Sequence, residues 1–151
     1  MLILTITDTL ISWGYPGMGI ASFLAGSFIP FSSEGVLTVL YACGFDLWLL
    51  TLWATIGNVL GGMFNYFVGR LCKEERVYKI FRVKKAKLEK SKERVHKYGA
   101  WMGLLSWIPI LGSCITIAMG VLHIGILKST VSISLGKILR YIVLALILML
   151  F

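Results

Sequence analysis

The sequence predicts an all-α integral membrane protein with two pseudo-symmetric halves in an inverted arrangement, each a re-entrant helical hairpin plus a transmembrane helix. Composition is the first indication. Of 151 residues, 58% are hydrophobic and only 15% are charged, and the mean hydropathy is +0.85. Too few charged residues are present to cover a soluble domain of this length. An uncharged run of membrane-spanning length and a sequence repeat complete the prediction.

Two segments are long enough to cross a bilayer. Residues 47–69 form an uncharged run of 23 residues, which as a helix measures about 34 Å and exceeds the hydrocarbon core of about 30 Å. Asp46 precedes this run as an expected N-cap, and Arg70 follows it at the expected cytoplasmic end. Residues 129–151 form the second predicted span, interrupted by Lys137 and Arg140.

Two further apolar segments are broken by proline. Residues 17–45 contain Pro30, and residues 99–126 contain Pro109. The limbs on either side have roughly 10–14 residues, whereas a crossing helix needs about 20. We therefore predict re-entrant hairpins whose turns are buried in protein or line a wet cavity. Residues 1–14 either lie at the interface or begin the first limb.

An internal repeat relates the two halves. The tetrapeptide Ser-Phe-Ile-Pro at 27–30 returns 79 positions later as Ser-Trp-Ile-Pro, and the pairs Gly57–Gly136 and Leu60–Leu139 match at the same offset. An odd number of crossings between the copies would invert one copy relative to the other, as in many secondary transporters. We expect one multi-pass domain with halves 1–70 and 99–151.

The linker between the halves is strongly basic. Residues 70–97 hold twelve of the fifteen basic residues and four of the seven acids, and so carry the whole net charge of +8. The positive-inside rule predicts a cytoplasmic loop. Apolar residues at helical spacing among the lysines predict that the linker 71–98 lies on the membrane as an amphipathic helix. Membrane tethering accounts for the charge, so nucleic acid is not an expected partner.

Charged and polar residues within the apolar segments are the candidates for a binding site. Glu34 follows the first proline, while Lys137 and Arg140 lie inside the second predicted span. Because a lone charge at membrane depth is costly, we expect Glu34 to lie near Arg140. The pair is either structural or part of a phosphate site, which a guanidinium suits. Asn58 and Arg70 complete the set of transport candidates.

Small residues form a stripe along the first span. Gly57, Gly61, Asn65 and Gly69 recur at every fourth position. Small residues allow two helix backbones to approach closely. The stripe therefore predicts a helix-packing face.

Signatures of metal sites and enzymes are missing from the sequence. Three cysteines and two histidines are widely spaced, so we expect neither a metal site nor a cofactor. The nucleophile-elbow, zinc-protease, phosphate-loop and dinucleotide motifs do not occur. We predict that the protein is not an enzyme.

Five ordered motifs resemble the small YqaA-like branch of the DedA family, the bacterial group with the SNARE-associated or VTT domain. They cover most of the chain, from about residue 23 to residue 143. The motifs are Pro30-x-x-Ser33-Glu34, Thr55-Ile56-Gly57-Asn58-x-Leu60-Gly61-Gly62, Tyr98-Gly99-Ala100, Leu105-Ser106-Trp107-Ile108-Pro109 and Leu135-Gly136-Lys137-x-Leu139-Arg140-Tyr141.

The resemblance implies a function in membrane homeostasis in the bacterial inner membrane. Implied activities are lipid scrambling or transport of phosphorylated lipid carriers, with coupling to H⁺ or Na⁺, and Glu34 is implied as the acid of the first hairpin. Larger members usually carry arginines three residues before and after the second proline, where this chain has Ser106 and Gly112. Lys137 or Arg140 is the alternative cation. A non-transporting scaffold, and assembly as a homo-oligomer, remain open alternatives.

Overall fold

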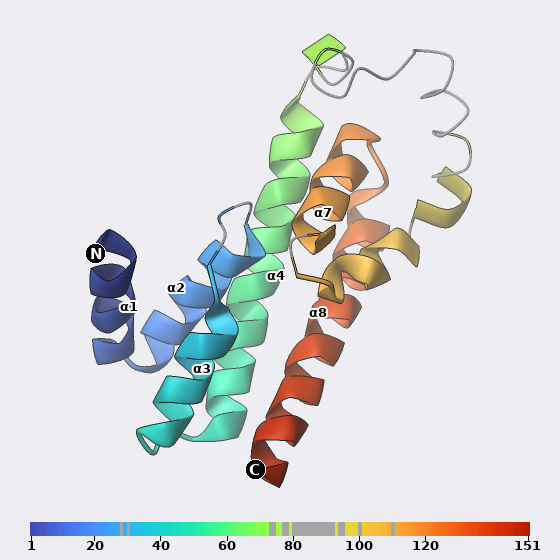
Figure 1. Cartoon of the computed structure of the whole chain (residues 1–151). Helices are drawn as coiled ribbons and strands as arrows, with labels where there is room; N and C mark the ends of the chain where they lie inside the picture. The colour runs from blue at the N-terminus through green and yellow to red at the C-terminus, as the bar shows by residue number, and fades with distance from the viewer. Residues whose placement is uncertain are drawn as a thin grey trace. The chain divides into compact units, whose positions relative to one another are not determined.

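The computed structural model describes residues 1–27, 29, 31–72, 75, 76, 79, 93, 96–99, 101–109 and 111–151 (Figure 1). Every regular element in these ranges is helical, which confirms the all-α prediction for the described part of the chain. Pro30 and most of the linker 71–98 lie outside the described residues, and with them the predicted break at Pro30 and the predicted amphipathic helix.

Three short helices precede the first long one. Helix α1 spans Leu2–Ser12 and is a separate element, joined to α2 (Tyr15–Gly26) through Gly14. Gly14 has a φ of 65°, a conformation that favours glycine. Helix α3 (Ser33–Ala42) begins at an N-cap serine, whose hydroxyl accepts a hydrogen bond from the backbone of the first turn. With 12 and 10 residues, α2 and α3 are each too short to cross a bilayer.

Both predicted spans are long helices. Helix α4 (Leu47–Leu71) and helix α8 (Ile126–Leu150) have 25 residues each and are long and apolar enough to cross a membrane. The Asp46 carboxylate accepts a hydrogen bond from the Leu49 N–H at 2.9 Å, which confirms the expected N-cap of α4. Helix α8 starts three residues before the predicted bound, because Ile126, Leu127 and Lys128 are helical too.

The second broken segment changes conformation at its proline. A 3₁₀ helix, η1 (Gly103–Trp107), ends at Ile108, whose ψ of 125° is extended. Such a backbone is expected directly before Pro109, since proline disfavours the helical conformation of the preceding residue. Helix α7 (Leu111–Val121) then follows with 11 residues.

The sequence repeat extends into the backbone geometry. The first residues of α4 and α8 are 79 positions apart, and so are the last. The turns that lead into these helices match as well. Phe45 N donates to Leu40 O at 3.2 Å, and at the equivalent place Ile124 N donates to Met119 O at 3.1 Å. Gly44 and His123, also equivalent, both have positive φ, at 92° and 52°. The turns are therefore the same C-terminal helix motif used twice.

The chain divides into two compact units, each drawing on both halves of the sequence. Unit 1 comprises Met1–Gly61 and Lys137–Phe151, and unit 2 comprises Gly62–Gly136. Buried aliphatic side chains of α2, α3 and α4 form most of the core of unit 1. A smaller buried cluster in unit 2 contains Tyr66, Met119, Ile124 and Ile133.

The glycine stripe of α4 packs closely against other helices. A Cβ added to Gly57 would lie 2.1 Å from the Gly19 oxygen of α2, and one added to Gly61 would lie 2.4 Å from the Phe23 oxygen. In unit 2, a Cβ on Gly69 would lie 2.1 Å from the Ile117 oxygen of α7. The stripe is thus a packing face along its length.

Candidate functional site

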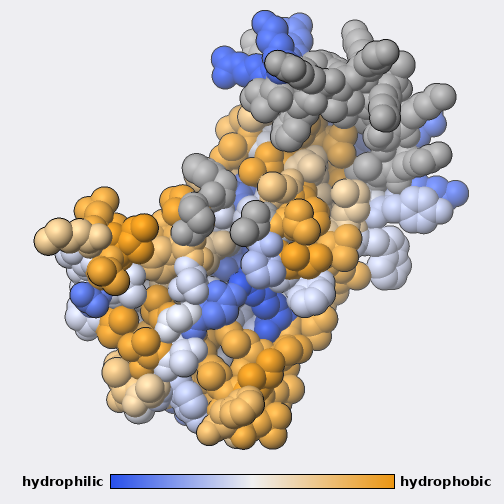
Figure 2. Space-filling view, in the orientation of Figure 1, coloured by the Kyte–Doolittle hydropathy of each residue, from blue (hydrophilic) through white to orange (hydrophobic). Residues whose placement is uncertain are grey.

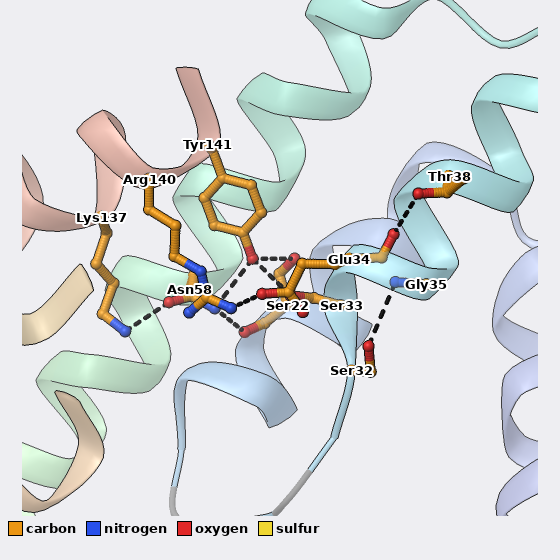
Figure 3. A network of polar contacts seen from close by, with 10 residues as sticks. All are labelled: Ser22, Ser32, Ser33, Glu34, Gly35, Thr38, Asn58, Lys137, Arg140 and Tyr141. Atoms are coloured by element: carbon orange, nitrogen blue, oxygen red, sulfur yellow. Dashed lines mark hydrogen bonds and ion pairs between the residues drawn. The ribbon is translucent and has the colours of Figure 1, made fainter. Parts of the chain in front are cut away.

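Unit 1 contains a network of polar side chains in otherwise apolar surroundings. Figure 2 shows hydrophilic side chains gathered on a largely hydrophobic face, in the region where α3 and α8 lie in Figure 1. Four helices contribute to the network (Figure 3), α2, α3, α4 and α8. Its members at the centre are Ser22, Ser33, Glu34, Asn58, Lys137, Arg140 and Tyr141.

Glu34 and Arg140 form an ion pair. Nη2 of Arg140 in α8 contacts Oε1 of Glu34 in the first turn of α3, and the side chains are 15% and 34% exposed, respectively. The pairing expected from their charges is therefore confirmed. A carboxylate in the first turn is also favoured by the dipole of α3. The pair is partly accessible, so its charges can interact with a molecule that reaches the surface of unit 1.

Lys137 is more deeply buried than the ion pair. The residue is only 3% exposed. Its Nζ donates a hydrogen bond to Oδ1 of the fully buried Asn58 at 2.5 Å. Among the residues that the structure describes, no carboxylate pairs with Lys137. The two partners are 79 positions apart and occupy equivalent places in the repeat. Within the described part of the chain, this buried ammonium is thus held by a neutral amide.

The Tyr141 hydroxyl connects the rest of the network. It lies 2.7 Å from the Ser33 hydroxyl and 3.2 Å from that of Ser22, and it accepts a hydrogen bond from Asn58 Nδ2 at 3.1 Å. Asn58 Nδ2 also donates to the Ser22 carbonyl at 3.1 Å. Sequence reasoning missed the tyrosine and both serines. A tyrosine beside Arg140 in an apolar span was the signal that could have predicted them, because a buried hydroxyl needs a hydrogen-bond partner.

Arg70 lies outside this network, in unit 2. Its Nη1 donates to the Tyr66 hydroxyl at 2.9 Å, and that hydroxyl donates to the Ile124 carbonyl in the turn after α7. The structure therefore brings four of the five transport candidates together in unit 1, whereas Arg70 belongs to unit 2. In the described ranges, no group of three His, Cys, Asp or Glu side chains could hold a metal ion.

The network is suited to binding an anion. Its two cations and one carboxylate leave a formal charge of +1, and amide and hydroxyl groups lie beside them. Charged donors with neutral donors around them are what phosphate oxygens require.

Comparisons with known proteins agree with this picture. A family model described as the VTT domain matches residues 29–150. Inner membrane protein YqaA of Escherichia coli is 34% identical over 128 residues, which cover 83% of this chain and 84% of that protein. Undecaprenyl phosphate transporter A of Staphylococcus aureus is 30% identical over 143 residues, 87% of this chain and 70% of that protein.

A further relative carries a different kind of name. An alkaline phosphatase-like protein of Lactococcus lactis is 30% identical over 155 residues, 92% of this chain and 71% of that protein. No solved structure was found to match the chain. The family model covers most of the sequence and includes both helices that are long and apolar enough to cross a membrane. The chain therefore belongs to the DedA family of VTT-domain proteins, in its YqaA-like branch, and is an integral protein of the bacterial inner membrane.

Proposed function

We propose that this protein moves anionic lipids, in particular phosphorylated lipid carriers, across the membrane, and that the network of unit 1 binds the phosphate. The buried ammonium of Lys137 carries the proposal. Its partner is the neutral Asn58 side chain, and no carboxylate in the described part of the chain pairs with it. A buried cation without a counter-ion is costly. A phosphate oxygen from a lipid headgroup would balance its charge.

Arg140 supplies the second phosphate-binding cation. Lys137 and Arg140 are three residues apart on α8, so their side chains leave the helix on neighbouring parts of one face. The guanidinium has five N–H donors and can contact Glu34 and a phosphate at once. Asn58 Nδ2 and the Tyr141 hydroxyl are adjacent neutral donors.

The carboxylate of Glu34 gives a route to ion coupling. A phosphate that draws the Arg140 guanidinium away from Glu34 leaves the carboxylate without its counter-ion. Glu34 would then take up H⁺ or Na⁺. The name of the Staphylococcus aureus relative, undecaprenyl phosphate transporter A, supports a phosphorylated polyprenyl carrier as the ligand.

The proposed transport path uses two inverted re-entrant hairpins. The lengths of α2, α3 and α7, all of 12 residues or fewer, support hairpins that enter and leave on the same side. The turn after α3 leads into the first residue of α4, whereas the equivalent turn after α7 accepts a hydrogen bond from Tyr66 in the last turns of α4. An inverted repeat requires such turns to face opposite sides of the membrane.

A scaffold without transport activity is the second candidate. The Glu34–Arg140 ion pair and the bonds of Tyr141 satisfy one another without any ligand, as they would in a purely structural network. In that case Lys137 has a packing role only. The name of the Lactococcus lactis relative adds a third outcome, release of inorganic phosphate from the lipid.

Lipid translocation in proteoliposomes tests these alternatives. Wild-type protein, Lys137→Gln and Arg140→Gln are reconstituted, with Lys97→Gln as a control because that lysine lies in the linker. We expect wild type and the control to move undecaprenyl phosphate, and each network variant to be slower by about tenfold or more, the value of a charged hydrogen bond. The double variant Glu34→Gln with Arg140→Gln should fold and remain inactive.

Three results would overturn the proposal. Wild-type translocation rates equal to those of empty vesicles would exclude transport and favour the non-transporting scaffold. Full transport activity of Lys137→Gln would contradict the proposal that the network of unit 1 binds the phosphate. Inorganic phosphate released in step with lipid loss would make the protein a phosphatase.

A further inference from the structure

A second candidate site lies in unit 2. It is an open groove of about 380 Å³ beside the first half of α8. Apart from one lysine and one serine, its lining is apolar. The lining residues are Trp101, Leu104, Leu127, Lys128, Val131, Ser132 and Leu135.

Close packing of α8 against the η1 segment creates the groove. A Cβ on Gly103 would lie 2.0 Å from Ser132 Oγ, and one on Gly136 would lie 2.7 Å from the Leu104 oxygen. Beside this contact, Leu127, Val131 and Leu135 follow one another at every fourth position of α8, with Trp101 opposite them in the lining. From Lys128 to Leu135 the groove follows α8 for about 10 Å.

The charge of the groove is confined to one end. Lys128 lies in the first turn of α8, and in the described residues no carboxylate pairs with it. Trp101 is 69% exposed, as is usual for a tryptophan at the level of lipid headgroups. The groove thus has a cationic mouth and an apolar body.

We propose that this groove holds one acyl chain of a resident anionic phospholipid, of the phosphatidylglycerol class, whose phosphate binds Lys128. An acyl chain matches the apolar body, and a phosphate matches the Lys128 ammonium, which pairs with no carboxylate among the described residues. A zwitterionic lipid fits less well, because its own cation would lie close to Lys128. The site is independent of the proposed transport activity, which uses Lys137 and Arg140 in unit 1.

Quenching of tryptophan fluorescence by bromine-labelled acyl chains tests the site. The intact protein is placed in vesicles of phosphatidylcholine and phosphatidylglycerol at equal mole fraction, with bromine on one lipid or on the other. The contribution of Trp101 is the difference between wild type and Trp101→Phe. We expect brominated phosphatidylglycerol to quench it about fivefold more effectively than brominated phosphatidylcholine, the preference that one lysine confers near a membrane surface.

A charge-reversal pair locates the preference. Lys128→Glu should abolish it, whereas Lys79→Glu, the same change at an exposed linker residue, should retain it. Lys128→Gln provides a milder variant should the reversal prevent folding. Equal quenching by both lipids in wild type would overturn the proposal. An equal lipid preference in Lys128→Glu and Lys79→Glu would also overturn it. So would shielding of Trp101 from both lipids by a second protein copy.

Discussion

Glu34 at the start of α3 and Arg140 near the middle of α8 form an ion pair within unit 1, although they lie in opposite halves of the sequence. The contact ties the short helix α3 to the long helix α8. It is also the one place where a charge from each half is neutralised by the other among the residues described.

Removal of Arg140 should destabilise the protein. Arg140→Ala leaves Glu34 without its counter-ion, and because both side chains are partly exposed we expect a loss of about 1–3 kcal/mol, below the cost for a fully buried pair. Thermal unfolding in detergent measures this effect. The double variant Glu34→Gln with Arg140→Gln should recover most of the loss. Unchanged unfolding of Arg140→Ala would show that the pair contributes no stability.

The Tyr141 hydroxyl should be worth more than its single polar atom suggests. Tyr141→Phe removes one partner each from Ser22, Ser33 and Asn58 inside a buried region. We expect a loss of about 1–3 kcal/mol in the free energy of unfolding. Tyr98→Phe is the matched control, because Tyr98 is 58% exposed and should tolerate the same change. Equal unfolding temperatures for the two variants would contradict the network.

The repeated turn predicts two substitutions of opposite sign. His123 has a φ of 52°, a conformation that costs a non-glycine residue about 1–2 kcal/mol. His123→Gly should therefore raise the unfolding temperature. Loss of the contact between the His123 ring and the Val121 carbonyl makes this rise smaller. Gly44→Ala at the equivalent turn should lower it. Since a Cβ there meets no atom within 4 Å, that loss would be purely conformational. Shifts of the same sign would contradict the equivalence of the turns.

The two ends of α4 should face opposite sides of the membrane. Cys43 lies four residues before α4 and Cys72 directly follows it, and both thiols are free. In single-cysteine variants, an impermeant maleimide added to intact cells should label Cys43 and not Cys72. In inside-out vesicles the labelling should reverse, because the basic linker after Cys72 is predicted to be cytoplasmic. Introduced Ser91→Cys provides a second cytoplasmic position. Labelling of Cys72 or Ser91→Cys from outside would refute this topology.

The long helices could be predicted because an uncharged run is a strong local signal. The ion pair could be predicted because few charged residues lie in the apolar segments. An uncharged run ending at Arg70 allows few alternatives to a span, and Glu34 was the one acid expected at the depth of Arg140. Tyr141 and its serines were missed for the opposite reason. Hydroxyl side chains are tolerated on many apolar helices, so only the packing of α2, α3, α4 and α8 reveals which hydroxyls meet. The bond of Arg70 to Tyr66 in unit 2 depends on packing in the same way.

The bond between Asn58 and Lys137 also bears on the origin of the chain. The two residues hold the same place in the repeat and contact each other, so in an ancestor assembled from two identical half-length chains the same residue would have met itself there. Lysine facing lysine would bury two like charges, and asparagine facing asparagine would provide no cation. The present contact of one lysine with one asparagine is therefore an asymmetry that two identical half-length chains could not carry.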